Sequence, residues 1–325
     1  MATKQMTLAE AVVDAIRLSF ADDPSVAMIW LPLFGIGPHR HVAEPLRREF
    51  ADRVLLPTTS ELGIAGIAVG AAMAGARPIV PFSMASFMFR AWDVIVQEAA
   101  VARHMSGGRT KVPVVFHALQ GVLPGAGAQH ALSPQALLWH APGLEIVLPS
   151  TPADAKGLFR RAIQSDNPTV VLNHGKLLGI EGPVDTGDYA LPFGRAALPR
   201  KGSDATIVAL SYQVHAALEA AETLSLEGIE VEIVDPRTLV PLDRTAILES
   251  VAKTGRLVVV DEGPLSCSAA SEIAAIVAEK GFESLVAPIA RVTRLDAPVA
   301  HSPALEESIL PNPARIAAAV RQLLA

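Results

Sequence analysis

The sequence predicts an α/β protein of two domains, and three observations carry that prediction. The chain has 325 residues, about twice the length of an average domain, and 50% of them are hydrophobic, enough for two large cores. Short continuous apolar runs alternate with segments of helical periodicity, a pattern typical of parallel strands buried on both faces. The alternation is interrupted once, between residues 176 and 204, where glycines, prolines and scattered charges gather.

In the first half of the chain, runs of aliphatic and β-branched residues predict strands at 26–31, 78–82, 112–117, 144–148 and 169–172. Between these runs, apolar residues recur with a helical period and predict helices at 7–21, 41–51, 61–75, 87–104, 133–141 and 151–164. We expect the first domain to span residues 1–183.

After a predicted linker at 184–204, the second domain is expected at 205–325. Apolar runs predict its strands at 205–210, 229–234, 257–260 and 285–292. Helical periods predict its helices at 214–226, 245–253, 269–279 and 313–324. Alternation of Ile229, Val231 and Ile233 with two glutamates predicts a strand with one solvated face.

Composition excludes several classes of function. The 27 basic and 33 acidic residues give a net charge of −6, so nothing favours nucleic acid or a membrane surface as partner. The longest uncharged run of small residues, 64–76, is too short and too rich in glycine to cross a bilayer. A single cysteine, Cys267, excludes an intramolecular disulfide and a cysteine-based zinc site. Since residues 1–18 do not form an export signal, we expect a cytoplasmic protein.

The turn after the first predicted strand argues against a dinucleotide site. It reads Pro32-Leu33-Phe34-Gly35-Ile36-Gly37-Pro38-His39, so a proline and bulky residues follow the first two glycines of a GxGxxG pattern. Walker, GxSxG and HExxH motifs are also missing from the sequence. Nicotinamide, ATP and serine-hydrolase functions are therefore disfavoured.

The segment from Thr58 to Gly66 contains the densest signal. Ser60 is a good helix N-cap, and Glu61 opens the helix, where a carboxylate also simply complements the helix dipole. Each glycine within the following turns costs about 1 kcal/mol relative to alanine. Such a helix is expected where another backbone or a flat ligand approaches closely.

Two further segments follow strand ends, where α/β sheets bind ligands. Residues 120–130 form a glycine-rich loop that closes on Gln129-His130, a histidine suited to catalysis or to a structural hydrogen bond. Residues 83–90 carry Phe87 and Phe89, which suit either the core or a ligand.

At these residues the sequence resembles a known family. TTSELGIAGIAVGAAMAGARPIVPF, SGGRTKVPVVF, QHALSPQALLWHAPGLEIVLPSTPADAKGLFRRAI and VDPRTLVPLD resemble the beta subunit of thiamine-diphosphate-dependent 2-oxoacid dehydrogenases, which include the pyruvate, branched-chain and acetoin enzymes. The likeness runs over nearly the whole chain. It implies a pyrimidine-binding, transketolase-like domain followed by a C-terminal transketolase-type domain.

The resemblance implies roles for individual residues. Glu61 matches the glutamate that hydrogen-bonds N1′ of the cofactor's aminopyrimidine, and Phe87 matches the aromatic side chain that stacks on that ring. Ser83 falls at a neighbouring pocket position. His130 matches the histidine that faces the substrate and the acyl-accepting lipoyl group.

The resemblance also implies contacts outside the pyrimidine pocket. Gly66 and Gly70 match a close-packed helix at the subunit interface. Ala162 and Asn167 fall near a loop that binds a monovalent cation such as K⁺ in some members, although Ser165 departs from that pattern.

The chain departs from the family at three places. Many relatives carry an acidic turn after the first strand, whereas this chain has Pro32-Leu33-Phe34, which puts proton communication between cofactor sites in doubt. Ala131-Leu132 follows His130 where relatives often have Ser-Gln, and Arg90 replaces a commonly uncharged residue. The pocket is therefore more apolar than usual, which favours a non-standard substrate.

The family's diphosphate and Mg²⁺ site is missing from this chain. Gly187-Asp188 is followed by Tyr189, and the later sequence has no asparagine before Asn312. We therefore expect the chain to hold the pyrimidine half of thiamine diphosphate, with Mg²⁺ held by an alpha subunit in an α₂β₂ heterotetramer. The expected reaction is decarboxylation of a small 2-oxo acid with acyl transfer to a lipoyl acyltransferase.

Two alternatives remain at the level of the sequence. One is a thiamine-diphosphate-dependent C–C lyase or ligase of acetoin or transketolase type that uses no lipoyl partner. The other is a non-catalytic scaffold subunit. Cofactor-dependent turnover by the assembled pair discriminates the scaffold, and dependence on lipoamide discriminates the other two.

Overall fold

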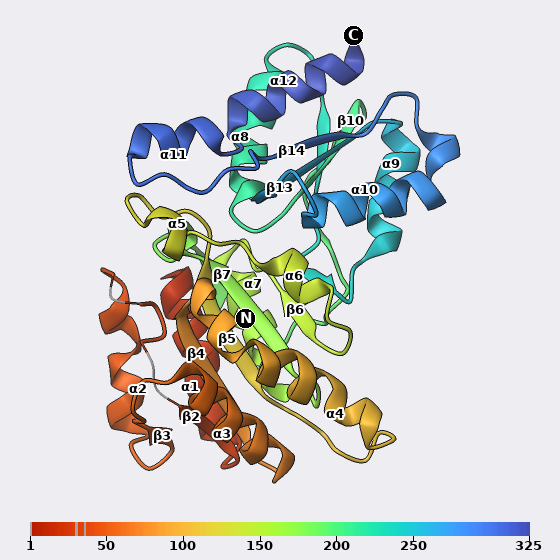
Figure 1. Ribbon diagram of the computed structural model, residues 1–325. Helices are drawn as coiled ribbons and strands as arrows, with labels where there is room; N and C mark the ends of the chain where they lie inside the picture. The colour runs from red at the N-terminus through yellow and green to blue at the C-terminus, as the bar shows by residue number, and fades with distance from the viewer. Residues whose placement is uncertain (1, 30–31, 36) are drawn as a thin grey trace. The chain divides into compact units, whose positions relative to one another are not determined.

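The computed structural model describes residues 2–29, 32–35 and 37–325. The chain divides into two compact units (Figure 1). Unit 1 contains the residues up to Gly121 together with Leu137–Phe193, and unit 2 contains Val122–Ala136 and Gly194–Ala325. Each unit is built around a largely parallel sheet flanked by helices, so the predicted α/β class is confirmed. The predicted domain boundaries at 183 and 205 stay predictions.

Unit 1 contains a parallel sheet in the order β6-β7-β5-β4-β2-β3. Its strands are β2 (Val26–Ile29), β3 (Val54–Leu55), β4 (Arg77–Met84), β5 (Val115–Gln120), β6 (Glu145–Val147) and β7 (Thr169–His174). All side chains of β5 and β7 are buried, as expected for central strands covered on both faces. The predicted strand 26–31 is confirmed as far as Ile29, and its last two residues lie outside the described residues.

Three helices of unit 1 begin within one residue of the predicted starts at 7, 61 and 151, the predicted helix 41–51 is divided into two pieces, and a short helix at 175–177 was not predicted. The helices of the unit include α1 (Leu8–Asp22), η1 (Arg40–Ala43), α2 (Glu44–Glu49), α3 (Glu61–Met73), α7 (Pro152–Gln164) and η4 (Gly175–Leu177). A capping box between Thr7 and Glu10 starts α1, and the Thr151 side chain accepts the Asp154 amide hydrogen at the start of α7. The predicted helix 87–104 is instead three successive pieces: 3₁₀ turns η2 (Ala85–Ala91), π-helix η3 (Val94–Ala99) and α4 (Ala100–Met105).

Residues 176–204, where glycines, prolines and charges interrupt the predicted alternation, contain two strands that the sequence does not predict. Strand β8 (Glu181–Asp185) pairs antiparallel with β1 (Thr3–Thr7), and β9 (Ala197–Arg200) joins the sheet of unit 2. The intervening chain is held to α7, because the Arg160 guanidinium binds Asp188 at 2.7 Å. These contacts join residues far apart in the sequence, which local composition does not reveal.

Unit 2 has a sheet in the order β14-β13-β10-β11-β9, in which only β9 runs antiparallel. The other strands of the unit are β10 (Ala205–Ala209), β11 (Val231–Asp235), β12 (Thr238–Val240), β13 (Leu257–Pro264) and β14 (Ala290–Arg294). Its remaining elements are α5 (Gly127–His130), α8 (Gln213–Ser225), α9 (Arg244–Thr254), α10 (Ala269–Lys280), η5 (Phe282–Ser284), α11 (Pro303–Ile309) and α12 (Pro313–Leu324). A short helix, α6 (Gln135–Trp139), follows α5.

The predicted wet face of the strand around Val231 is wrong. All five side chains of β11 are buried, and Glu232 is only 3% exposed. Its carboxylate pairs with the ammonium of Lys253 on α9, which packs against β11. Burial of a glutamate is tolerated here because its charge has a partner.

Within the described ranges, every helix is too short or too polar to cross a membrane.

Candidate functional site

Glu61 is the first residue of α3, and the helix starts there because Ser60 caps it. The Ser60 hydroxyl accepts the Gly63 amide hydrogen at 3.2 Å, with Ser60 itself in an extended conformation. The Glu61 side chain is half-buried, and its carboxylate has neither a hydrogen bond nor an ion pair to any residue that the structure describes. A carboxylate without a protein partner at a helix start is able to accept a hydrogen bond from a ligand or share its proton.

Helix α3 presents an unusual exposed face. Leu62, Ile67 and Met73 are 47%, 56% and 40% exposed. Gly66 and Gly70 lie exposed between them, and no heavy atom of unit 1 lies within 4 Å of the position that a Cβ atom would take at either glycine. We call these five residues the apolar face of α3. Nothing within the described chain therefore explains why glycine stands at these two positions.

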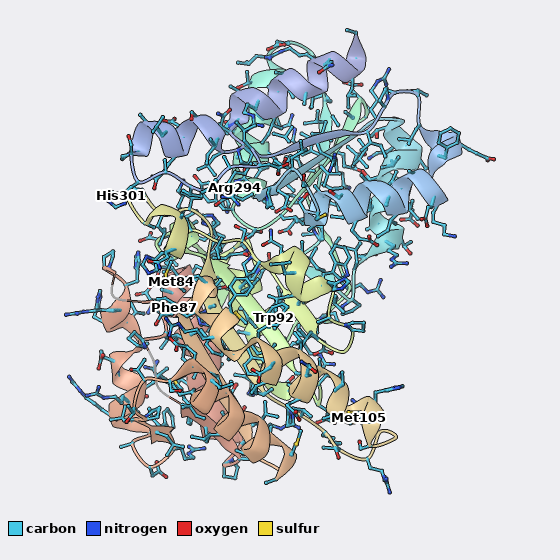
Figure 2. All side chains as sticks on the ribbon, viewed as in Figure 1. Met84, Phe87, Trp92, Met105, Arg294 and His301 are labelled. Atoms are coloured by element: carbon cyan, nitrogen blue, oxygen red, sulfur yellow. The ribbon has the colours of Figure 1, made fainter. Side chains whose placement is uncertain are left out.

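The end of β4 brings Ser83 and Phe87 close to α3, since β4 and the following η2 both pack against that helix. Ser83 has a left-handed backbone conformation, with φ of 62°, and its hydroxyl donates a hydrogen bond to the carbonyl of Pro32 at 3.0 Å. Phe87 lies in η2, one turn after the strand, and is half-buried (Figure 2). The buried Ser86 hydroxyl has no protein partner among the described residues.

The turn where relatives carry an acid is apolar and buried in this chain. Leu33 and Phe34 are 1% and 2% exposed, and the Phe34 ring packs edge-on against the His117 ring with centroids 6.2 Å apart. Burial lowers the pKa of His117 to about 3, so this imidazole is neutral. Asn173 lies 3.0 Å from its Nε2 atom. Neutral groups therefore occupy the interior of unit 1 at this turn, as the sequence indicates.

His130, in contrast, belongs to unit 2. It ends the short helix α5, and the next residue, Ala131, is buried in an apolar cluster with Val122, Val299 and Leu310. This packing gives a reason for alanine after the histidine, because a serine hydroxyl there would need a buried partner. Glu61, Ser83 and Phe87 share unit 1, whereas His130 lies on the other unit.

The glycines of the loop that leads to His130 have specific structural roles. Gly121, Gly125 and Gly127 all have positive φ, a conformation that disfavours other residues. At Gly121 a Cβ atom would also lie 2.0 Å from Nε2 of His174. The glycine pattern singled out in the sequence thus reflects backbone conformation at three points and close packing at one.

The loop with Ala162 and Asn167 already binds a positively charged side chain of the protein, that of Arg77. The Arg77 guanidinium donates hydrogen bonds to the carbonyls of Ile163 and Ser165, at 3.0 and 2.9 Å. The carbonyl of Ala162 accepts the Ser165 amide hydrogen. The carbonyl groups of this loop therefore suit positive charge, although two of them bind a side chain of the protein itself.

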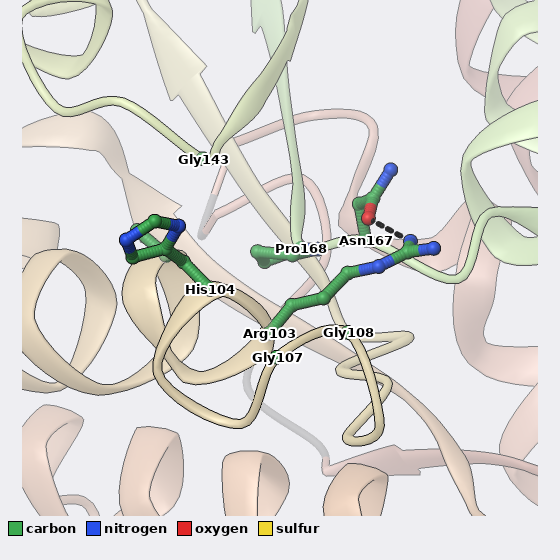
Figure 3. A pocket seen from close by; sticks show the side chains of 8 residues that line it. Arg103, His104, Gly107, Gly108, Gly143, Asn167 and Pro168 are labelled. Atoms are coloured by element: carbon green, nitrogen blue, oxygen red, sulfur yellow. Dashed lines mark hydrogen bonds between the residues drawn. The ribbon is translucent and has the colours of Figure 1, made fainter.

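A surface pocket of unit 1 lies on the other side of Asn167. It is lined by Arg103, His104, the exposed turn with Gly107 and Gly108, Gly143 and Pro168 (Figure 3). The Arg103 guanidinium donates a hydrogen bond to the Asn167 side chain at 2.5 Å. The pocket includes Asn167 but none of the residues expected to contact the pyrimidine, Glu61, Ser83 and Phe87.

Asp188, which follows Gly187 in the sequence, is bound by a side chain of the protein itself. The Asp188 carboxylate is held by Arg160, and both the hydrogen bonds and the charge of that guanidinium lower the pKa of Asp188. Among the described residues, histidine, cysteine and acidic side chains nowhere gather in a group of three suited to a metal ion.

Sequence reasoning missed the carboxylates that hold the His130 loop. Asp261 and Glu262 stand at the end of β13, and Glu306 lies on α11; all three are at least 95% buried. An acidic pair after a strand of valines, at the carboxyl end of a parallel sheet, was an available signal for two of them. Nothing in the local sequence distinguishes Glu306 from its neighbour Glu307.

Comparison with protein families matches both parts of the chain. Residues 4–180 match the pyrimidine-binding domain of transketolase, and residues 194–316 match the C-terminal domain of transketolase. Together these matches cover most of the chain, in the order that the sequence predicts.

Curated relatives match almost the full length. The chain is 42% identical to the beta subunit of acetoin:2,6-dichlorophenolindophenol oxidoreductase from Cupriavidus necator, over 99% of this chain and 98% of the relative. It is 38% identical to the subunit of the same name from Bacillus subtilis, over 98% and 97%. It is also 38% identical to the beta subunit of the pyruvate dehydrogenase E1 component from Rickettsia felis, over 98% of both chains.

A solved structure supports the fold. A split-gene transketolase, described as an inactive beta4 tetramer, superposes with a TM-score of 0.81 over 98% of both chains, at 23% identity.

Proposed function

Because this chain belongs to the transketolase-type family, among the beta subunits of acetoin and pyruvate dehydrogenase E1 components, we propose that it completes a thiamine-diphosphate-dependent active site together with an alpha subunit. The proposed reaction is oxidative decarboxylation of a small 2-oxo acid, with transfer of the acyl group to a lipoyl acyltransferase. We also propose a cytoplasmic location for the assembly, which agrees with a chain containing a single cysteine.

One observation carries the proposal. Among the described residues, the Glu61 carboxylate has no hydrogen-bond or ion-pair partner, and it stands at the start of a helix whose exposed face is apolar and interrupted by glycines. A partly buried carboxylate normally finds a partner in its own fold. A carboxylate without such a partner, next to an apolar surface, suits a ligand that has a flat ring and a ring nitrogen able to form a hydrogen bond. The exposed apolar surface also suits a place that another chain covers.

The residues of unit 1 fit the pyrimidine half of the cofactor. The chemistry that thiamine diphosphate supplies when bound is a carbon nucleophile that also serves as an electron sink. Glu61 holds a proton shared with N1′ of the aminopyrimidine, which acid–base catalysis requires of a group within hydrogen-bond reach. Phe87 offers its ring face for stacking, and Ser83 fixes the strand end through its bond to Pro32.

His130 is proposed to orient the substrate and to exchange a proton with it or with the acyl acceptor. A histidine on a glycine-rich loop suits this role, because its ring nitrogens can donate or accept a hydrogen bond and glycines let the loop backbone pass close to a ligand.

The apolar face of α3 is proposed as part of the contact with the alpha subunit in an α₂β₂ assembly. Three large side chains on this face are at least 40% exposed. A continuous apolar surface of this kind marks protein–protein contacts. Gly66 and Gly70 allow a second helix backbone to approach closely, which agrees with the open space around their Cα atoms.

The proposed metal sites lie on different subunits. Mg²⁺ and the diphosphate are proposed to lie on the alpha subunit, because Asp188 is bound to Arg160. We also propose a monovalent cation near Ala162 and Asn167. The carbonyl groups of this loop already bind the positive charge of Arg77.

A second candidate function follows from the relatives. Two of the three relatives reported above, at 42% and 38% identity, are acetoin oxidoreductase beta subunits that are named with a dye as electron acceptor. Acetoin cleavage breaks a C–C bond next to a carbonyl carbon, as decarboxylation does. An apolar turn at Leu33 and Phe34 in place of an acid agrees with such a neutral substrate.

The test is co-expression of the chain with its alpha subunit, followed by native mass spectrometry with thiamine diphosphate and Mg²⁺. Reduction of 2,6-dichlorophenolindophenol is then measured with pyruvate and with acetoin, with and without lipoamide. Turnover of pyruvate that passes acyl groups to lipoamide supports the first candidate. Turnover of acetoin alone, independent of lipoamide, supports the second. An assembled pair that binds cofactor but turns over neither substrate points to a non-catalytic scaffold.

A further inference from the structure

The loop that carries His130 is packed at both ends against other residues of unit 2. Val122 at its start and Ala131 after its histidine are 2% and 1% exposed, in one cluster with Val299 and Leu310. Apolar side chains of unit 2 therefore pack against both ends of this loop.

Between these ends, a buried carboxylate holds the backbone. Glu306 on α11 is 4% exposed, and its two oxygens accept the Gly125 amide hydrogen at 3.0 and 3.3 Å. Burial of a carboxylate is costly unless hydrogen bonds compensate it. The neighbouring Glu307 on the same helix is exposed and makes no side-chain bond among the described residues. Helix α11 thus directs one of two adjacent glutamates inward onto the loop.

A second carboxylate acts at the start of the loop. Glu262 at the end of β13 accepts the Val122 amide hydrogen at 2.6 Å and the Gln213 side chain at 3.1 Å. Asp261, the residue before it, accepts the Gln135 side chain at 2.6 Å, just beyond the loop. Three carboxylates of unit 2 therefore bind the fourteen-residue segment 122–135 at three points: the Val122 amide, the Gly125 amide and the Gln135 side chain.

Within the loop, one backbone turn is closed by the Ala126 amide, which donates a hydrogen bond to the Leu123 carbonyl at 3.0 Å. Gly125 and Gly127 have φ of 73° and 67°, and His301 of unit 2 lies beside them, with its Nδ1 atom 3.4 Å from the position of a Cβ on Gly127 (Figure 2). Glycine costs more conformational entropy on ordering than any other residue. External bonds such as the one from Glu306 are what select one conformation.

We propose that Glu306 is a positioning residue for His130: its buried carboxylate fixes the loop through the Gly125 amide and thereby sets where the imidazole stands. This inference rests on the proposed function of His130, but the bond itself can be tested without turnover. Glu306 acts only through the backbone and touches no reacting atom.

The first test measures the bond in the full chain. Glu306→Ala is expected to speed hydrogen exchange of the 122–131 segment about tenfold or more, because the protected amide loses its acceptor. Glu307→Ala is the matched control and is expected to leave exchange unchanged. Unchanged exchange in Glu306→Ala overturns the proposal, whatever the enzyme's activity. If Glu306→Ala does not fold, Glu306→Asp replaces it, since the shorter side chain cannot reach Gly125.

The second test asks whether the bond acts through His130 in the assembled complex. Glu306→Ala is expected to lower kcat by about 10- to 100-fold, as for a catalytic group displaced by a fraction of an ångström. The KM for the substrate and the Kd for thiamine diphosphate are each expected to change less than about twofold. Glu306→Gln is expected to restore most of kcat, because its amide oxygen also accepts the Gly125 hydrogen.

The double variant decides between positioning and general stability. If Glu306 acts through His130, then His130→Ala combined with Glu306→Ala turns over no more slowly than His130→Ala alone. Independent, multiplicative losses overturn the proposal. If His130→Ala retains wild-type turnover, the function assigned to His130 fails and positioning fails with it, while altered exchange in the first test still establishes the bond. Altered exchange with unchanged kcat overturns positioning alone.

Discussion

The two candidate regions of this protein are held in opposite ways. The start of α3 exposes an unpartnered carboxylate and an apolar face with open space beside its glycines. The His130 loop is tied to its own unit by three buried carboxylates and an apolar cluster. The first region needs another molecule to complete it, and the second is completed within the chain.

This difference teaches where each region gets its precision. A side chain that meets a ligand across a subunit interface is fixed only after assembly, so its contacts are absent from a single chain. A histidine on a flexible, glycine-rich loop must be fixed beforehand, because ordering the loop during each turnover costs conformational entropy. Four substitutions sharpen or break this contrast.

The largest effect is expected at Glu61. Glu61→Gln keeps the size of the side chain and much of its hydrogen bonding but cannot exchange a proton, so turnover of the assembled complex is expected to fall about 10²- to 10⁴-fold. Thermal unfolding of the isolated chain is expected to stay unchanged, since the carboxylate makes no bond within it. Glu249→Gln on the exposed side of α9 is the control. Turnover within threefold (about 0.7 kcal/mol) of wild type would falsify the catalytic role.

The next effect concerns the apolar face of α3. Gly66→Leu is expected to stabilise the isolated chain by up to about 1 kcal/mol, because leucine is the better helix former and finds open space there. The same change is expected to weaken assembly with the alpha subunit at least tenfold, since overpacking a tight interface costs about 1–3 kcal/mol. Calorimetry of the chain and sedimentation of the pair measure the two effects. Ala278→Leu, exposed on α10, is the control; equal assembly of both variants would place the interface elsewhere.

A smaller effect is expected on the pH dependence of folding stability, to which a buried group in each unit contributes with opposite sign. His117 in unit 1 has a pKa lowered by burial to about 3 from 6.5, so below pH 6.5 the unfolded chain takes up a proton that the folded chain does not. Its contribution to stability is therefore lost as pH falls from 6.5 toward 3, by about 1.4 kcal/mol per pH unit at most. Burial raises the pKa of Asp261 in unit 2, so that carboxyl opposes folding as pH rises.

We expect His117→Gln to flatten the pH dependence of unfolding between about pH 7 and 5, a window that contains the ordinary histidine pKa of 6.5. The glutamine retains an acceptor for Asn173 but does not titrate. Urea unfolding of both proteins at the two pH values measures the change. Parallel pH dependences would show that the folded protein protonates this imidazole.

The smallest effect is expected at Phe87. Phe87→Ala removes a stacking surface worth about 0.5–1.5 kcal/mol, so the assembled complex is expected to bind thiamine diphosphate several-fold more weakly. Phe282→Ala is the control, because that ring is 71% exposed in unit 2. Loss of stability in Phe87→Ala without any change in cofactor affinity would instead identify Phe87 as a core residue.

The sequence by itself determined the α/β class, most element positions and the start of α3. These features depend on local physics: the period of apolar side chains, the Ser60 cap and the first-turn glutamate all act within a few residues. The resemblance to beta subunits, which the comparisons confirm, was legible for the same reason, since it rests on contiguous motifs.

Only the tertiary structure decided which unit holds His130 and what surrounds it. The bond from Gly125 to Glu306 joins residues 181 positions apart, and β1 pairs with a segment that composition describes as a linker. Glu232 looked solvated by alternation, yet a lysine on a neighbouring helix buries it as an ion pair. The physical reason is common to all three: a polar group's environment is set by what folds against it, and those partners lie far away in the sequence.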